Sequence, residues 1–285
     1  MASIKQLRGR IRTAKTIGQI TRAMKLVAAA RLRRAQDRVL EARPYSDKMQ
    51  ELVQSLGAAS ESLEHPLLAK REIKRYGVIL VTAERGLCGG FNAQLNRKAF
   101  DFVRSTVGEP VFLCVGKKGQ VFFEKRGYKV AHTVNLPTSG PTRSHAKEVM
   151  DAAESMFTSG ELDAIYLIYS KFYSAVRQVP QVVQLLPIEP PSSETQTHSV
   201  NYAFEPNAET LLQELLPRYA LTLILQALLE STASEHGARM TAMTNATDSA
   251  SDLVKTLTLQ ANRTRQAAIT KEILEIVAGA DALKG

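Results

Sequence analysis

The feature that most constrains this chain is a helical pattern of apolar residues at each end of the sequence. In the first segment, apolar or small residues recur every three or four positions, which gives the narrow stripe of a coiled-coil helix. Gly9 and Gly18 interrupt this segment and should weaken the helix by about 1 kcal/mol each. The expected seam, meaning the residues that face a partner helix, is Ile4, Leu7, Ile11, Ala14, Ile17, Ile20 or Thr21, Met24 and Ala28.

A second such segment begins near Glu209 and continues through the last residues of the sequence. Many of its apolar positions are alanine, and small side chains would let two helices approach closely. Pro217 should kink this helix, and Pro44 should bend or fray the first one. The expected seam residues of the second segment are Leu211, Leu212, Leu215, Leu216, Met240, Met243, Ala246, Ala250, Leu253, Leu257, Ala261, Ile269, Ile273, Ile276 and Ala280.

The two segments are too long to be covered by an ordinary globular core. At about 1.5 Å per residue, about 55 residues span roughly 80 Å and about 70 residues span roughly 105 Å. A domain of about 150 residues offers no core of that length, so each apolar stripe needs a partner of similar length. We therefore predict that the two segments pack together as a long antiparallel two-helix coiled coil.

The middle of the chain alternates between short β-rich runs and helical patterns. Continuous apolar strands that alternate with helices are typical of a mainly parallel sheet covered on both faces. The predicted fold is therefore α/β: the coiled coil plus a Rossmann-like domain with a mainly parallel five-stranded sheet. The predicted strands are 76–82, 110–115, 128–133, 164–169 and 179–186, and the predicted helices are 92–105, 117–125 and 143–159. The predicted division is 1–58 and 208–285 for the coiled coil and 74–205 for the central domain.

The positive charge of the chain is concentrated at its beginning. The formal net charge is +9, and residues 1–36 hold ten Lys and Arg and no acidic residue. A solvated helix face is the usual meaning of a charge run, but this one predicts a negatively charged partner: nucleic acid, anionic lipid or an acidic protein surface. The predicted cationic face consists of Lys5, Arg8, Arg12, Lys15, Arg22, Lys25, Arg31, Arg33 and Arg34.

No motif in the sequence indicates chemistry. The glycine-rich loop 84–92 follows a predicted strand and opens a helix, but it is neither GxGxxG nor a P-loop. Cys88 and Cys114 lack metal-ligand spacing, which favours reduced structural thiols. No catalytic triad, HExxH motif or carboxylate pair stands out, and no apolar run is long enough to span a bilayer. We therefore predict no catalytic, cofactor-binding or metal-binding residue in this chain.

Two other functions remain open at this point. A dinucleotide-binding enzyme could be built on the central sheet, and it would bind nucleotides tightly through the loop after the first strand. A DNA-binding coiled-coil protein could use the cationic helix, and its affinity for DNA would fall steeply with salt.

Several stretches of the sequence resemble the gamma subunits of bacterial F-type ATP synthase. They are 20–32 (ITRAMKLVAAARL), 42–45 (ARPY), 84–92 (ERGLCGGFN), 233–243 (ASEHGARMTAM), 245–248 (NATD) and 262–279 (NRTRQAAITKEILEIVAG). The resemblance extends over essentially the whole chain. It departs at Glu84, where the family usually has Asp, and at Gly237, where it usually has Ala.

The resemblance implies a rotor shaft with no active site of its own. In the family, the coiled coil inserts into a hexamer of alpha and beta subunits, while the central domain holds epsilon and helps to seat the shaft on the membrane c-ring. Ion flow turns the ring and the shaft, and the asymmetric shaft presses the three catalytic beta subunits in sequence. ATP, ADP and Mg bind the alpha and beta subunits. The family also implies one copy per complex, no nucleic acid, and a peripheral position on the cytoplasmic face of the bacterial cell membrane.

The resemblance also implies which residues make the contacts of the shaft. Contact with the beta subunit is expected at Met24, Arg239, Gln266 and Thr270. The cationic face would lie toward the acidic lever segment that family beta subunits carry. The family's central-domain motif is expected in the loop formed by Arg85, Gly86, Leu87, Cys88, Gly89 and Gly90.

Overall fold

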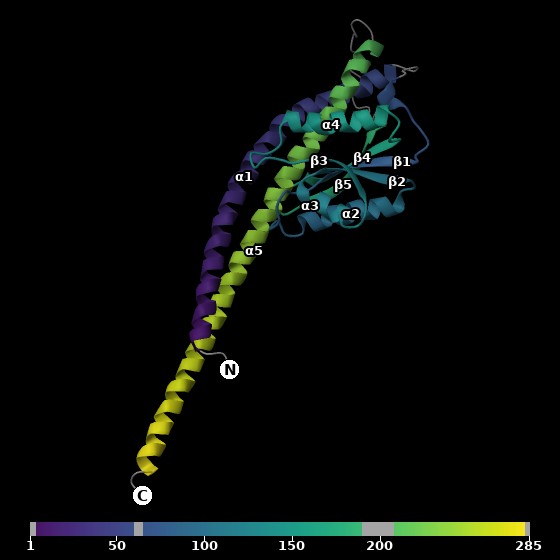
Figure 1. Cartoon of the computed structure of the whole chain (residues 1–285). Coiled ribbons are helices and arrows are strands. Elements are labelled where there is room, and N and C mark those ends of the chain that lie inside the picture. Colours follow the sequence, from purple (N-terminus) through teal and green to yellow (C-terminus); the bar gives the residue numbers. More distant parts are fainter. Residues whose placement is uncertain (1–3, 60–64, 190–207, 283–285) are drawn as a thin grey trace. The chain divides into compact units, whose positions relative to one another are not determined.

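Two very long helices begin and end the chain, and an α/β sheet lies between them in the sequence (Figure 1). The computed structural model describes residues 4–59, 65–189 and 208–282. The long helices are α1 (Ile4–Ala59) and α5 (Ala208–Ala282), and a short 3-10 helix, η1 (Pro66–Leu68), follows α1. The chain separates into two compact units, a terminal unit (Met1–Val27 with Met240–Gly285) and a central unit (Ala28–Arg239). The predicted boundaries 1–58, 74–205 and 208–285 stay a prediction, and residues 190–205 lie outside the described residues.

In the terminal unit, α1 and α5 pack side by side and run in opposite directions (Figure 1). Thr247 Oγ1 donates a hydrogen bond to Thr21 Oγ1 over 2.8 Å. Three residues earlier on α1, a Cβ atom on Gly18 would lie 3.6 Å from the Cβ of Ala250. Thr21 is thus paired with Thr247, and the earlier residue Gly18 is paired with the later residue Ala250. The residue numbers on the two helices change in opposite directions, so the predicted antiparallel pairing is confirmed. The buried seam residues of this unit are Leu7, Ala14, Thr21, Met243, Ala250 and Leu257.

Two predicted seam positions, Ile17 and Leu253, are wrong by one residue. Ile17 is 48% exposed, while its neighbour Gly18 lies close to Ala250. Of the two alternatives Ile20 and Thr21, the structure selects Thr21, which is buried, whereas Ile20 is 54% exposed. On α5, Leu253 is likewise 51% exposed. The error arises because buried positions of a helix recur after either three or four residues. Two adjacent positions can therefore both fit the pattern, and the pattern does not tell which of them faces the partner helix. Gly18 therefore marks a close approach of two helices rather than a weak point in one.

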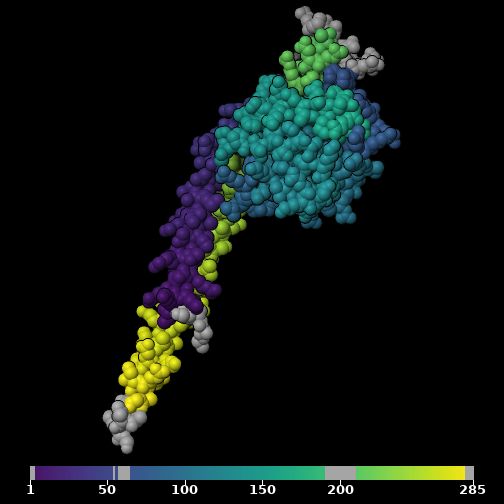
Figure 2. Space-filling view, viewed as in Figure 1, coloured from purple at the N-terminus to yellow at the C-terminus, as the bar shows by residue number. Residues whose placement is uncertain are grey.

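The last part of α5 has no partner from the described part of α1. The register that pairs Gly18 with Ala250 places Ile4, fourteen residues earlier, level with about residue 264. Beyond that level α5 continues alone (Figure 2), so the predicted seam is wrong there and Ala280 lies outside the described side chains. The exposed apolar residues of this stretch are Ile269, Ile273, Leu274, Ile276 and Val277.

Neither proline interrupts its helix. Pro44 lies inside α1 and Pro217 lies inside α5. The fraying predicted at Pro44 is wrong, and the kink predicted at Pro217 does not end the helix. Pro44 is exposed, as is Leu40 one turn earlier, so the carbonyl group that loses its N–H partner can be solvated by water.

The central unit contains the predicted five-stranded sheet, whose strand order is β3-β2-β1-β4-β5. Strands β1 to β4 pair in parallel, and β5 pairs with β4 in the antiparallel direction. The mainly parallel α/β sheet is therefore confirmed, with element ends within three residues of the predicted ones. The elements are β1 (Arg75–Val81), α2 (Phe91–Ser105), β2 (Glu109–Val115), α3 (Lys117–Glu124), β3 (Lys129–Val134), α4 (Arg143–Thr158), β4 (Ala164–Phe172) and β5 (Gln178–Leu186).

Both faces of the sheet are covered by helices. Successive residues of a strand point to opposite faces, so neighbouring residues of β1 belong to different clusters. Val78 and Leu80 of β1 pack in a cluster with Leu95 of α2 and Phe123 of α3. The neighbouring strand residues Ile79 and Val81 pack instead against α4, the end of α1 and the beginning of α5. Each fully buried aliphatic side chain contributes about 1.5–3 kcal/mol. Within the central unit, the beginning of α5 is therefore part of the sheet's own core: Leu212, Leu216, Ala220, Ile224 and Leu228 all belong to this second cluster.

The close approach in the terminal unit predicts that a disulfide can join the two helices. Cβ atoms in disulfides are about 3.5–4.5 Å apart, and the separation between Gly18 and Ala250 is 3.6 Å. The double variant Gly18→Cys/Ala250→Cys should therefore form a cross-link under mild oxidation, detected by mass spectrometry of the digested protein. The control pair Ile17→Cys/Ala250→Cys should stay reduced because Ile17 points away, and equal cross-linking of both pairs would contradict the described register. The native thiols of Cys88 and Cys114 are buried and should not compete.

Candidate functional site

The glycine-rich motif loop, residues 85–90, lies where a parallel sheet would normally bind a ligand. It follows β1, which has β2 on one side and β4 on the other. Ligands of open α/β sheets bind outside the carboxyl ends of the strands, where the strand order changes direction. The place of this loop in the fold therefore makes it the first candidate for a functional site.

Hydrogen bonds from its own neighbours hold the motif loop in shape. The side-chain oxygen of Asn92 accepts a hydrogen bond from the backbone N–H of Ala83 over 3.0 Å. The Asn92 amide nitrogen donates to the Cys88 sulfur over 3.1 Å. Glu84 accepts a hydrogen bond from the backbone N–H of Leu136 over 2.9 Å. Burial raises the pKa of the Cys88 thiol, so this cysteine is protonated at neutral pH and serves the packing of the loop.

Leu87 is displayed at the surface of the loop in an unfavourable backbone conformation. Its φ angle is +62°, in the left-handed region that non-glycine residues rarely adopt, and its side chain is 64% exposed. Such a conformation costs about 1–3 kcal/mol and persists only when the surroundings enforce it. The loop therefore presents an apolar side chain to the outside at an energetic cost, which is typical of a contact surface.

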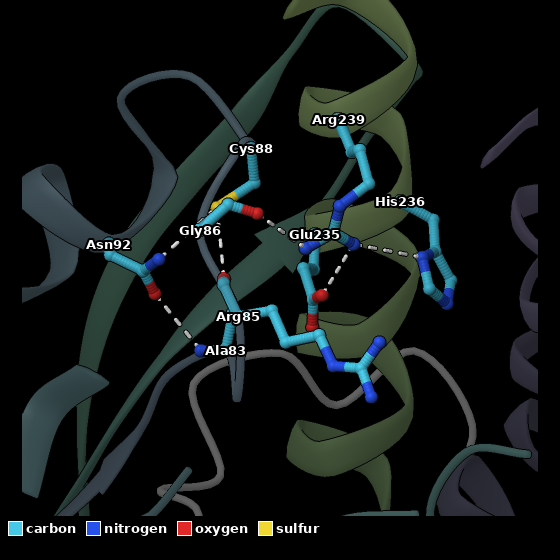
Figure 3. Close-up of polar contacts among 8 residues, drawn as sticks. All are labelled: Ala83, Arg85, Gly86, Cys88, Asn92, Glu235, His236 and Arg239. Atoms are coloured by element: carbon cyan, nitrogen blue, oxygen red, sulfur yellow. Dashed lines mark hydrogen bonds and ion pairs between the residues drawn. The ribbon is translucent and has the colours of Figure 1, made fainter. Parts of the chain in front are cut away.

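Arg239 of α5 binds the motif loop to the long helix (Figure 3). Its guanidinium donates to the backbone carbonyl of Gly86 over 3.2 Å and to the carboxylate of Glu235 over 2.5 Å. A third contact of 3.4 Å joins it to Nδ1 of His236. The side chains of Arg239 and Glu235 are only 13% and 20% exposed, so this ion pair is largely removed from water.

The surroundings of Arg239 shift the pKa values of both neighbours on the helix. Burial raises the pKa of Glu235, against the attraction of the Arg239 guanidinium. Burial and the positive charges of Arg239, Arg31 and Arg34 lower the pKa of His236 to about 4. His236 is therefore neutral at physiological pH, and its Nδ1 can accept a hydrogen bond from Arg239.

The lowered pKa of His236 predicts a loss of stability in mild acid. An unfolded histidine has a pKa of 6.5, so between about pH 6.5 and 4 the unfolded chain binds a proton that the folded chain does not. Stability should therefore fall as the pH drops through this window, by about 2 kcal/mol between pH 7 and pH 5. Urea denaturation at both pH values should show this loss in the native chain and not in His236→Gln. The same slope in both proteins would mean that another group is responsible.

Helix α5 also covers the neighbouring end of β4. Glu230 accepts a hydrogen bond from the backbone N–H of Phe172 over 3.3 Å. The hydroxyl of Ser234 donates to the carbonyl of Ser170 over 3.0 Å. A Cβ atom on Gly237 would lie only 3.3 Å from the carbonyl oxygen of Ala175. The edge where a dinucleotide would bind is thus occupied by α5. These contacts couple α5 mechanically to the sheet.

The structure brings only one of the predicted contact residues to the motif loop. Arg239 is bound to Gly86, as described above. In the terminal unit, Met24 is half-buried, whereas Gln266 and Thr270 are exposed on the part of α5 that continues alone. Their contact with a beta subunit stays a prediction. Among the described residues, no group of His, Cys, Asp and Glu is arranged to hold a metal ion, and the absence of metal, cofactor and catalytic residues also stays a prediction.

The predicted cationic face lies mostly in solvent. Lys25 and Arg31 are half-buried, and the other members of the face are exposed. Of the ion pairs found among the described residues, none involves Arg22, Arg33 or Arg34. These charges are therefore placed to meet a negatively charged partner, and that contact stays a prediction.

Sequence reasoning missed the roles of Glu235 and His236. Glu235 and Arg239 are four residues apart, which is the spacing of an ion pair on a helix surface, so the pair itself could have been found. The contact with Gly86 could not, because it joins positions 153 residues apart in the sequence.

In the described part of the chain, no helix combines the length and apolar character needed to cross a membrane.

Comparison with known proteins gives a consistent result. Residues 3–283 match the sequence family described as ATP synthase. The ATP synthase gamma chain of Brevibacillus brevis is 48% identical over 283 residues, 98% of each chain. That of Pelotomaculum thermopropionicum is 48% identical over 284 residues, the full length of both. Among solved structures, a chain of the Euglena gracilis mitochondrial ATP synthase (OSCP/F1/c-ring, rotational state 3) has a TM-score of 0.70 at 18% identity. That similarity covers 98% of this chain and 94% of the other, and it shows a shared fold.

Proposed function

We propose, because this chain belongs to the gamma-chain family of ATP synthase, that it is the central rotor shaft of that enzyme. The chain would couple ion-driven rotation of a membrane c-ring to sequential conformational changes in three catalytic beta subunits, or run the same cycle in reverse with ATP hydrolysis. It would have no active site itself, and ATP, ADP and Mg would bind the alpha and beta subunits. The observation that carries this proposal is the antiparallel pairing of α1 and α5 in the terminal unit.

The two helices have the properties that transmission of torque requires. Each is unbroken over its whole described length, including its proline. In the central unit, α5 is joined to the sheet by Glu230, Ser234 and Arg239 and contributes to its core. A twist applied to the sheet domain would therefore be passed directly to α5.

An asymmetric shaft can drive three identical sites through different states. A partner shifts a conformational equilibrium only through contacts that differ between the two states. An asymmetric pair of helices inside the hexamer of alpha and beta subunits, the surrounding sleeve, offers each of the three beta subunits different contacts at any moment. Each exposed ion pair between shaft and sleeve is worth about 1 kcal/mol or less, so charge attraction would not block rotation.

The surfaces of the chain fit such a sleeve. The exposed apolar side chains on the last part of α5, among them Ile273 and Ile276, would be buried by surrounding subunits. Gln266 and Thr270 lie on the same part of the helix, and with Met24 and Arg239 they are the proposed contacts with beta. The cationic face would lie toward an acidic segment of beta. The Euglena gracilis structure is named for F1 and the c-ring, which supports an association of this chain with both.

The remaining partners and the location follow from the same proposal. The central domain would hold the epsilon subunit and contact the c-ring, and one copy of the chain would serve each complex. No nucleic acid would take part. The chain would be a peripheral subunit on the cytoplasmic face of the bacterial cell membrane.

Co-expression tests the proposal directly. Alpha and beta subunits from the same genome should be purified with and without this chain, and magnesium-dependent ATP hydrolysis should be measured for each preparation. We expect a complex with one copy of the chain and sustained activity that is lost when the chain is omitted. Equal activity with and without the chain, or failure to co-purify, would contradict the proposed function.

A further inference from the structure

A small polar pocket in the central unit brings three arginines together. It has a volume of about 110 Å³ and lies between α1, α5 and the loop that precedes α4. Arg31, Arg34 and Arg38 line it from α1, and their three- and four-residue spacing places them on one face of that helix. From α5, Thr232 and His236 complete the wall.

The arginines of this pocket form no ion pair with an acid in the described part of the chain. Glu235 is the acid whose pKa responds to Arg31, but its carboxylate is already bound to Arg239. Arg31 is half-buried, and Arg34 and Arg38 are exposed, so water weakens the repulsion between these three like charges. An anion between them would relieve the repulsion that remains.

The loop opposite α1 is fitted closely to Arg38. A nitrogen of the Arg38 guanidinium donates to the carbonyl of Ser139 over 2.9 Å. At the next residue, Gly140, φ is +97° and an added Cβ would lie 2.9 Å from the same nitrogen. The hydrogen bond to Ser139 uses one of the five N–H groups of this arginine. The rest of its guanidinium is left to serve the pocket.

We propose that this pocket binds a tetrahedral oxyanion, with inorganic phosphate as the chemistry that it fits best. Arginine matches phosphate because its planar fork can donate two parallel hydrogen bonds to two oxygens. On the opposite wall, the hydroxyl of Thr232 already donates to the carbonyl of Leu228 over 2.7 Å, so the ring N–H of neutral His236 is the further donor. Pockets for drug-sized ligands begin at about 300 Å³, so the volume of about 110 Å³ admits an ion of this size and not a whole nucleotide. The inference is independent of the proposed rotor function.

Phosphate binding by the purified full-length chain tests the proposal. The chain should be dialysed into phosphate-free buffer, and binding of radiolabelled orthophosphate should be measured at a fixed ionic strength set with chloride. We expect one saturable site per chain with a Kd below about 1 mM, which corresponds to about −4 kcal/mol. Arg34→Gln and Arg31→Gln should each weaken binding at least tenfold.

Arg33→Gln is the matched control, because it removes the same charge from an exposed neighbouring position outside the pocket. It should change the Kd less than twofold. Equal weakening by Arg33→Gln would show diffuse attraction to the positive helix and overturn the proposal, as would the absence of saturable binding below about 10 mM, where affinity falls under about −3 kcal/mol.

A second readout reports the location of the anion. The ring of His236 can be followed by NMR of histidine-labelled protein and assigned with His236→Gln. Because Arg31 and Arg34 help to lower the pKa of His236 to about 4, an anion between them should raise it. Saturating phosphate should therefore move the titration midpoint of His236 upward, while that of His65, which lies outside the pocket, stays in place. Phosphate binding with no change at His236 would place the site elsewhere.

Discussion

Replacing Arg239 with alanine should lower the free energy of unfolding of the chain by about 2–4 kcal/mol. The variant would leave the carboxylate of Glu235, 20% exposed, without its partner, and it would also remove the hydrogen bond to Gly86. An unpaired charge in such a position costs more than the pair itself contributes. Urea denaturation followed by circular dichroism measures the effect.

Two controls separate the buried charge from the mere loss of a side chain. The double variant Arg239→Ala/Glu235→Gln should recover part of the lost stability, because no unpaired carboxylate remains. Arg218→Ala, at an exposed position of the same helix, should change stability by less than about 0.5 kcal/mol. If the double variant were as unstable as the single one, the role assigned to Glu235 would be wrong.

Replacing Gly18 with tryptophan should separate α1 from α5 in the terminal unit. A large side chain there must displace Ala250, whose Cβ lies 3.6 Å from the position of the new Cβ. Forcing extra atoms into a packed interface costs about 1–3 kcal/mol. Hydrogen exchange should therefore become faster along the first turns of α1, and the assembled complex should lose ATP hydrolysis.

Two further substitutions test whether the effect of Gly18→Trp comes from the contact between the two helices. Gly9→Trp adds the same side chain to the same helix, but a Cβ there meets nothing within 4 Å, so it should leave the pairing intact. Gly18→Ala should stabilise the chain by about 0.5–1 kcal/mol, because its Cβ fits at an ordinary contact distance and alanine favours the helix. Equal disruption by both tryptophans would show that Gly18 has no special place in the interface.

The sequence was sufficient for the elements of the fold because each depends on local pattern. The five apolar strand runs and the helical stripes of both ends were visible without any contact information. The sequence pattern could not decide whether Ile17 or Gly18 faces the partner helix, or whether Leu253 or Val254 does. That choice depends on the exact direction of the partner helix. The exposure of Ile273 was equally hidden, since it follows from the antiparallel register that places the start of α1 level with about residue 264.

The candidate site was predictable in part for the same reason. The motif loop stood out through its glycines and its place after a strand. The pocket formed by Arg31, Arg34 and Arg38 did not, because its other walls come from Ser139 and His236, more than a hundred residues away in the sequence. Such a site becomes visible only when the fold has brought three separate segments together.

The central claim, that this chain turns as a shaft, is tested most directly by watching it turn. Val107 is 86% exposed while both native cysteines are buried, so Val107→Cys offers a single reactive thiol for attaching a bead to the central unit. In a complex with alpha and beta subunits fixed to a surface, ATP should drive the bead in one direction, with three stops per turn. A bead that stays still, or only fluctuates, on a complex that hydrolyses ATP at its full rate would contradict the account.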